Sequence, residues 1–284
     1  MRIGFLCSYT EEDLELAARC GFGSVELIVG QGAPLDPAKT KREAALKAKE
    51  DFARRGLEVS AIGCYQNNLA PKEADRTRNV KHLENLLKLC EWMGVDTLCT
   101  FAGRDPEKDI PDNIPAFKKV FAPLAKKAAD KGLRIAFENC PMFHSFPFRG
   151  INIAYCPKAW DLMFDAVPAD NLGLEYDPSH LICMLQDYVQ IIYDYGERIF
   201  HVHAKDAEVV WRECKRNGIL EHGAVRHRTP GMGQADWKQI VSALREVGYK
   251  GNLDIEGRHD PIYKGASEEE GLIIARKHLE QFIG

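Results

Sequence analysis

The stretch Lys131-Gly132-Leu133-Arg134-Ile135-Ala136-Phe137-Glu138 decides the fold. It follows an amphipathic run over residues 114–131, and Gly132 stands where the left-handed end of a helix favours glycine. A short apolar run then begins, which is typical of a strand buried on both faces, and it ends in an acidic residue. This stretch predicts the step from a helix into a strand of a parallel sheet.

The same order of helix, glycine and strand recurs along the chain. Glycines at positions 21, 56, 94, 196 and 248 also follow apolar-periodic stretches. Eight apolar strands alternate with amphipathic helices, and no Ser/Gly-rich linker separates them. We therefore predict the α/β class and a single (βα)8 TIM barrel, with one domain over residues 1–284. The strands are expected at 2–7, 24–28, 58–63, 97–101, 134–138, 172–176, 199–203 and 252–256, and the helices at 11–20, 37–55, 74–93, 114–131, 157–166, 181–195, 236–247 and 268–283.

The composition of the chain indicates which classes of partner and which cellular compartment to expect. The net charge of −4 argues against nucleic acid, because phosphate binding requires a basic face. Residues 1–7 lead directly into the first predicted strand, so we expect no signal peptide, and no apolar run reaches the ~18–20 residues of a membrane span. The nine cysteines form no C-x-x-C pair and are expected to be buried thiols. We expect a cytoplasmic protein without a membrane partner, with a homo-oligomer as a possible state.

Four successive predicted strands end in residues that bind hard metal ions: Glu138, Asp177, His203 and Glu256. A parallel barrel gathers the carboxyl ends of its strands on one face, so these side chains should converge. Three carboxylates and one imidazole suit a divalent cation, with coordination positions left open for a substrate. We predict one metal ion, Mn²⁺ first, with Mg²⁺, Co²⁺ or Zn²⁺ as alternatives.

Neighbouring residues extend this predicted site. In His201-Val202-His203 the strand alternation sends both imidazoles to one face, and His203 lies nearer the rim, so His201 is expected to pack one layer deeper. His180 follows Asp177 on the next loop, where it would contact a substrate oxygen. The long loop at 204–235 concentrates Arg and Lys side chains and is expected to form a substrate lid. We assign substrate binding to His180, Lys205, Arg226 and His259.

The metal-ligand set indicates a chemistry with three possible outcomes. A hard cation on a ketone oxygen acidifies the neighbouring C–H, and a carboxylate can remove that proton to give an enediolate. If Glu138 and Glu256 face each other across the substrate, return of the proton to the opposite face is epimerisation. Return to the neighbouring carbon is aldose–ketose isomerisation, and loss of a β-hydroxyl is dehydration. The residues support the shared first step and leave the second open.

Five stretches carry a resemblance to a known family. They are Glu138–Met142, Gly173–Leu181, Phe200–Asp206, Pro230–Trp237 and Asp254–Glu256. Through them the whole chain resembles the sugar phosphate isomerase/epimerase family of xylose-isomerase-like TIM barrels, whose members include D-tagatose 3-epimerase-type ketose epimerases and inosose dehydratase. The resemblance implies metal ligands at Glu138, Asp177, His203 and Glu256, the two glutamates as the catalytic acid/base pair, and His180 as a substrate contact. We therefore expect a metal-dependent sugar isomerase or epimerase of carbohydrate metabolism.

The chain departs from the ketose epimerases beyond the metal histidine. Those enzymes have an arginine a few residues after it, whereas no arginine occurs here until Arg212. The long 204–235 loop resembles that of another branch of the family, whose members act on oxidised sugars such as 3-keto-glycosides. The expected substrate is therefore a keto-sugar or a keto-glycoside.

Three alternatives remain open. A lyase that dehydrates a keto-inositol or a keto-sugar derivative would use the same metal ion and base. Apurinic endonucleases share the barrel, but they need further histidine ligands at the ends of the third and fourth strands, where this chain has Gly63-Cys64-Tyr65 and Phe101-Ala102-Gly103. The third alternative is a non-enzymatic sugar-binding protein. Loss of a metal ligand would favour it, but all four predicted ligands are present in the sequence.

Overall fold

The computed structural model describes residues 1–145 and 149–283, and eight of its strands form a closed parallel barrel. The strands are β1 (Ile3–Cys7), β2 (Ser24–Ile28), β3 (Glu58–Cys64), β4 (Thr97–Thr100), β5 (Arg134–Glu138), β8 (Leu172–Tyr176), β9 (Ile199–Ala204) and β12 (Leu253–Ile255). They close in the order β1-β12-β9-β8-β5-β4-β3-β2. The predicted (βα)8 TIM-barrel class is confirmed.

Helices connect the strands, as the alternating pattern predicts. The α-helices are α1 (Glu11–Cys20), α2 (Arg42–Arg54), α3 (Glu73–Met93), α4 (Ile110–Ala129), α5 (Pro157–Ala166), α6 (Pro178–Cys183), α7 (Tyr188–Tyr195), α8 (Trp211–Asn217), α9 (Trp237–Glu246) and α10 (Glu268–Ile283), with 3-10 turns η1 (Gly196–Arg198) and η2 (Gly265–Ser267). Among the described residues, no helix combines the length and the apolar character needed to cross a membrane.

The chain divides into two compact units, Glu26–Glu175 and Met1–Val25 together with the chain from Tyr176 onwards. The predicted single domain over residues 1–284 stays a prediction. In the unit of residues 26–175, β3, β4, β5 and β8 pair in parallel, and the register sets Glu138 beside Glu175. Helices α3 and α4 pack side by side, and the rings of Phe117 and Phe121 meet that of Phe137 on β5. This packing buries the apolar segment Ile135–Phe137 of β5.

In the other unit, β1 pairs with β12 and β12 pairs with β9. The register of the second pair sets His203 beside Asp254, so that Lys205 and Glu256 directly follow the ends of two adjacent strands. Helix α10 packs against α1 and α9, and Gly21 ends α1 in the left-handed conformation that the sequence predicts. These strands therefore bring the carboxyl ends of β9 and β12 together at one edge.

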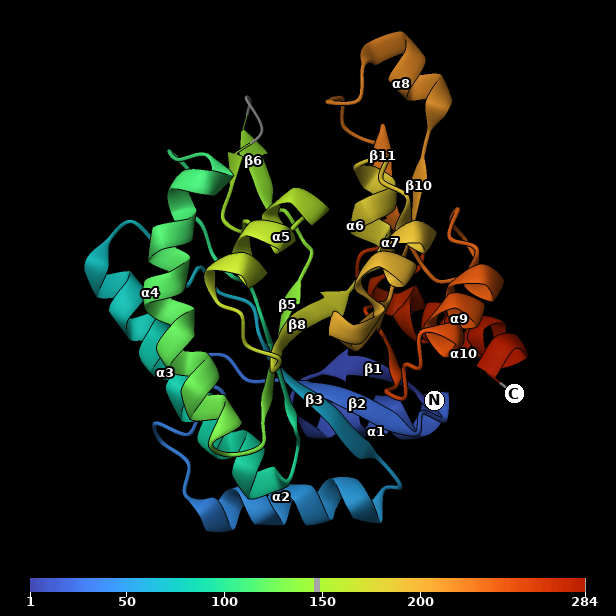
Figure 1. The fold of residues 1–284 in the computed structure, drawn as a ribbon. Helices are drawn as coiled ribbons and strands as arrows, with labels where there is room; N and C mark the ends of the chain where they lie inside the picture. Colours follow the sequence, from blue (N-terminus) through green and yellow to red (C-terminus); the bar gives the residue numbers. More distant parts are fainter. Residues whose placement is uncertain (146–148, 284) are drawn as a thin grey trace. The chain divides into compact units, whose positions relative to one another are not determined.

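Two hairpins interrupt the barrel order. Strands β10 (Asp206–Val209) and β11 (Val225–Arg228) form an antiparallel pair within the predicted 204–235 lid, and α8 lies at its tip (Figure 1). The hairpin buries Ala207 and Val209 against Ile182 of α6. Strands β6 (Phe143–Ser145) and β7 (Arg149–Gly150) form the second pair, and residues 146–148 between them lie outside the described residues.

The hairpin base is fixed by one buried carboxylate. Asp206 accepts hydrogen bonds from the backbone N–H groups of Ala207, Gly231, Gly233 and Ala235 at 2.8–3.2 Å. Gly231 has φ of +89°, and a Cβ on Gly233 would lie 2.1 Å from Asp206 Oδ1. Both glycines of the turn are therefore required by its backbone and by the close approach of Asp206.

Candidate active site

Asp177 is fixed by the local chain that follows β8. It has an extended backbone and is the N-cap of α6, with Pro178 in the first helical turn. Its Oδ1 accepts the backbone N–H of Ser179 at 2.7 Å, and its Oδ2 lies 3.3 Å from His180 Nε2. The Asp-Pro-Ser-His sequence thereby ends a strand, caps a helix and holds a fully buried carboxylate at the strand end.

Strand alternation separates the two histidines of β9 by depth, as the sequence predicts. His201 Nε2 lies 3.1 Å from Asp254 Oδ2, and Asp254 accepts a hydrogen bond from Ser24 Oγ at 2.8 Å. His203, one pleat further along, has its Nδ1 3.4 Å from Glu256 Oε2. His201 is therefore engaged within the barrel core, while His203 faces the strand-end carboxylates.

Glu256 directly follows β12, and its two oxygens face different partners. Oε2 lies 2.8 Å from Lys205 Nζ as well as near His203, and Oε1 lies 2.9 Å from His259 Nε2. One ligand atom from each of Asp177, His203 and Glu256 lies within 4.8 Å of the other two. The structure thus brings together three of the four residues predicted as metal ligands, within one compact unit.

Lys205 supplies a buried positive charge to this group. Only 2% of the residue is exposed, and its Nζ lies 3.8 Å from Asp177 Oδ2 in addition to its contact with Glu256. Burial alone would raise the pKa of Glu256, but Lys205, together with His203 and His259, holds it well below its ordinary value. Glu256 is therefore ionised at neutral pH and available as a ligand or a base.

The predicted substrate contacts His180 and His259 lie on either side of a third imidazole, that of His227. The ring centroids of His180 and His227 are 4.8 Å apart, and those of His227 and His259 are 6.1 Å apart. His227 comes from β11, and we did not assign it as a site residue from the sequence. Alternation along Val225-Arg226-His227-Arg228 is the signal that would have separated His227 from its neighbours.

Arg226 lies apart from this group. Its side chain is 44% exposed and pairs with Glu208 across the β10–β11 hairpin. Arg228 also pairs with Glu208, and both guanidinium groups together hold the pKa of that carboxyl below its ordinary value against the opposing effect of burial. A substrate role for Arg226 stays a prediction.

Glu138 ends β5 in the unit of residues 26–175 and is 4% exposed. Asn152 fixes the chain that follows it, because its amide donates to the backbone carbonyls of Glu138 at 2.9 Å and Cys140 at 2.8 Å. A buried carboxylate held rigidly at a strand end is suited to bind a cation or to move a proton.

A second group of buried acids lies in the same unit. The hydroxyl of Tyr65 lies within hydrogen-bond distance of both Glu26 and Glu175, with 2.9 Å to Oε2 of the latter, and its single proton can be donated to either carboxylate. Burial raises the pKa of Tyr65 well above its ordinary value, and the charges of Glu175 and Glu26 raise it further. Tyr65 is therefore a permanent hydrogen-bond donor between two carboxylates that are both 0% exposed.

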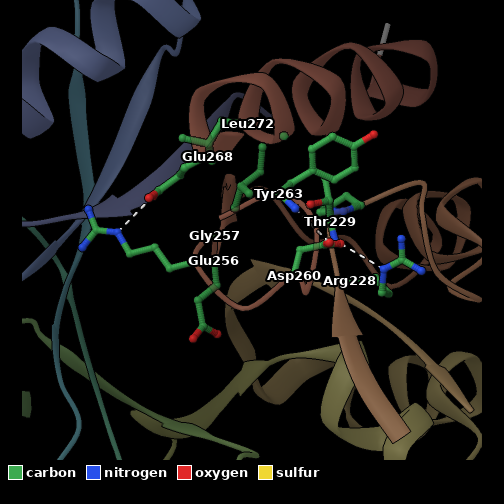
Figure 2. Close-up of a pocket in the computed structure, with 12 residues that line it drawn as sticks. Arg228, Thr229, Glu256, Gly257, Asp260, Tyr263, Glu268 and Leu272 are labelled. Carbon is green, nitrogen blue, oxygen red and sulfur yellow. Dashed lines mark hydrogen bonds and ion pairs between the residues drawn. The ribbon is translucent and has the colours of Figure 1, made fainter. Parts of the chain in front are cut away.

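Asp260 joins the hairpin to the loop that carries His259. It accepts from the backbone N–H groups of Thr229, Ile262 and Tyr263 and from Nε of Arg228, at 2.8–3.1 Å. Figure 2 shows Asp260 with Arg228, Thr229 and Tyr263 at one side of a small cleft, and the Glu256 carboxylate pointing away from them. Burial would raise the pKa of Asp260, but the backbone N–H groups and Arg228 lower it to about 2.

Curated relatives of this chain include one match over nearly its full length. An uncharacterized protein, YfiH of Bacillus subtilis (strain 168), is 26% identical over 96% of this chain and 95% of its own length. Inosose dehydratase of Geobacillus thermodenitrificans (strain NG80-2) is 27% identical over 57% of this chain, which spans about half (52%) of that enzyme.

Several solved structures share the fold. A xylose isomerase domain protein from Planctomyces limnophilus gives a TM-score of 0.75 at 20% identity, covering 99% of this chain and 96% of that one. IolI, solved with a bound zinc atom, gives 0.72 at 20% identity and full coverage of both chains. The 3-keto-D-glucoside 4-epimerase YcjR from E. coli gives 0.72 at 18% identity, covering 98% of this chain and 99% of that one.

A family model of the xylose isomerase-like TIM barrel matches residues 14–282, which is nearly the whole chain. The strand ends that carry Glu138, Asp177, His203 and Glu256 all lie within this match. This chain belongs to the xylose isomerase-like TIM-barrel family.

Proposed function

We propose that this protein is a divalent-metal-dependent isomerase or epimerase of a keto-sugar or keto-glycoside. The observation that carries the proposal is the grouping of Asp177, His203 and Glu256 at adjacent strand ends of a chain in this family. YcjR, whose fold is similar, is a 3-keto-D-glucoside 4-epimerase, which supports a keto-sugar substrate.

The donor set fits a divalent cation. Two carboxylates and one neutral imidazole are ligands that Mn²⁺, Co²⁺ and Zn²⁺ accept, and three protein ligands leave positions open. We propose Glu138 as the fourth ligand, because the carboxyl ends of all strands in a closed parallel barrel lie on one face. When bound, the cation stabilises the negative charge that develops on a carbonyl oxygen as the neighbouring carbon loses its proton.

The chain's own residues would move that proton. Glu256 is ionised at neutral pH and is the proposed base, and Glu138 is the proposed acid that returns a proton to the opposite face. His180 and His259 would orient sugar oxygens by hydrogen bonds. The buried ammonium of Lys205, 2.8 Å from Glu256, would hold that carboxylate in place.

A second candidate function is dehydration of a keto-inositol or a related keto-sugar. It is favoured by the 27% identity to inosose dehydratase. The two functions share the deprotonation step and differ in whether a hydroxyl group β to the carbanion leaves.

Exchange of carbon-bound hydrogen with solvent tests both functions. The protein, stripped with a chelator and reloaded with Mn²⁺, is incubated in D₂O with D-fructose, D-tagatose and methyl 3-keto-glucosides, and the sugars are analysed by NMR and mass spectrometry. We expect deuterium beside a carbonyl only in the reloaded sample. A product whose mass differs from the substrate only by the incorporated deuterium identifies an epimerase or isomerase, and loss of water identifies the dehydratase. Exchange that is equal without metal contradicts the proposal.

A further inference from the structure

Three imidazoles from three separate elements form a row beside the metal-ligand group. His180 lies on α6, His227 on β11 and His259 after β12, and successive rings meet edge to face. The two outer rings each contact a carboxylate, since His180 Nε2 lies 3.3 Å from Asp177 and His259 Nε2 lies 2.9 Å from Glu256. The central ring, His227, makes no such contact among the described residues.

The polar edge of His227 is available for a ligand. Its Nδ1 is buried and has no hydrogen-bond partner within the described part of the chain. A buried imidazole nitrogen without a partner destabilises the protein unless a ligand or water satisfies it. Burial, and then the positive charges of Lys205 and His180, lower the pKa of His227 to about 2, so the ring is neutral.

The charged groups that flank the row already have partners. Arg226 and Arg228 pair with Glu208, and Arg228 also pairs with Asp260. Arg258, which precedes His259, pairs with Asp13 and Glu268. A phosphate or a carboxylate placed at His227 would therefore meet a neutral ring and guanidinium groups that are already engaged.

We propose that His227 is a specificity-determining residue that hydrogen-bonds an uncharged hydroxyl group of the sugar. The inference rests on the proposed function and adds to it the residue and the kind of group that it recognises. A neutral imidazole offers one N–H donor and one acceptor nitrogen, which matches a hydroxyl group. Sugars that carry a phosphate or a carboxylate at this position are discriminated against, because the anion would lose its hydration while the nearby cations, Lys205 included, are already paired with carboxylates.

The β10–β11 hairpin holds His227 in position for the proposed contact with the sugar hydroxyl. Asp206 fixes the base of the β10–β11 pair through four backbone N–H groups, and Asp260 holds the same end through Thr229 and Arg228. Ala207 and Val209 on the same hairpin pack on α6, which carries His180. The position of His227 relative to His180 is thus set by packing and by buried hydrogen bonds.

Three variants test the contact in the Mn²⁺-loaded protein. H227F keeps a ring and removes both nitrogens, H227N keeps a polar atom near the position of Nδ1, and H222N alters an exposed histidine on the same hairpin as a matched control. The readout is the initial rate of deuterium incorporation, with kcat and KM determined separately. The substrates are the sugars of the D₂O panel, each paired with its 6-phosphate, and thermal unfolding checks the fold.

We expect H227F to raise KM by roughly 2- to 12-fold, the equivalent of one hydrogen bond to a neutral group, with kcat little changed. H227N should recover most of the loss, H222N should match the wild type, and the neutral sugar should be preferred over its phosphate. An unchanged KM in H227F, or a preference for the phosphorylated sugar, would overturn this inference alone. Absence of exchange in the wild type would overturn the proposed function, and this inference with it.

Discussion

The ammonium of Lys205 lies 2.8 Å from Glu256 Oε2 and 3.8 Å from Asp177 Oδ2, in a position where it is almost wholly buried. Ligand atoms of Asp177 and Glu256 lie within 4.8 Å of each other, so the two carboxylates would repel each other without a neighbouring positive charge. Lys205 therefore neutralises the carboxylates in the protein without metal, and a bound divalent cation would take over part of that role.

Replacing Lys205 with Met should destabilise the metal-free protein more than the metal-loaded protein. Removing one partner of a buried ion pair costs on the order of 3 kcal/mol, which corresponds to a decrease in Tm of about 6 °C or more in a chain of this size. Thermal unfolding of K205M with chelator and with Mn²⁺ measures the difference. An equal loss of stability in both states would show that Lys205 does not compensate these carboxylates.

Replacing either proposed acid/base residue by its amide should stop proton transfer and leave the fold intact. E138Q and E256Q each keep the size of the side chain but cannot accept a proton, so we expect exchange to fall by about 10²- to 10⁴-fold or more. E12Q, at an exposed position on α1, is the matched control. Near-full exchange in either site variant would remove that residue from the acid/base pair.

The strand ends were predictable because their signals are local. In the stretch from Gly132 to Glu138, a glycine ends a helix, an apolar run follows and an acid closes it, and the structure has β5 at the expected bounds. The sequence likewise separates His203 from His201 by the period of a strand. Closure of the barrel then groups these ends, so that local patterns predict much of the candidate metal site.

The parts that were missed depend on tertiary contacts. The sequence predicts one helix over 181–195, whereas the chain breaks between α6 and α7, where Leu185 has φ of +58° and Asp187 caps the second helix. It predicts the basic 204–235 loop as a substrate lid, and this loop contains the β10–β11 hairpin. The two strands of this hairpin are separated by 15 residues, so no short turn motif in the sequence indicates that they pair. For this reason the sequence does not identify His227 as a site residue.

Asp260 should make the stability of the protein depend measurably on pH in the acidic range. Its pKa falls from 3.8 to about 2 on folding, so the folded state is stabilised above the unfolded pKa by roughly 2 kcal/mol, and this contribution is lost as the pH falls from about 4 to 2. D260N should therefore lower Tm at pH 7 and approach the wild type near pH 2. A constant difference between the two proteins across this range would contradict the assignment.

Asp206 should be required for the hairpin. In D206N an amide NH₂ replaces one of two oxygens that accept backbone N–H groups, which leaves buried donors without partners at a cost of about 1–3 kcal/mol. We expect a lower Tm and faster amide hydrogen exchange in residues 206–235, with D165N, at an exposed site on α5, as the matched control. Unchanged exchange in this segment would show that the hairpin is held by other contacts.

The most direct test of the central claim is the metal content of the protein. Wild type, D177A, H203A and the control D165N are stripped with chelator, reloaded with Mn²⁺, freed of unbound metal and analysed by elemental mass spectrometry. We predict one Mn²⁺ per chain in the wild type and in D165N, and a loss of most of it in D177A and H203A. A wild type that retains no divalent metal ion, or ligand variants that retain as much as the wild type, would contradict a metal centre at these strand ends.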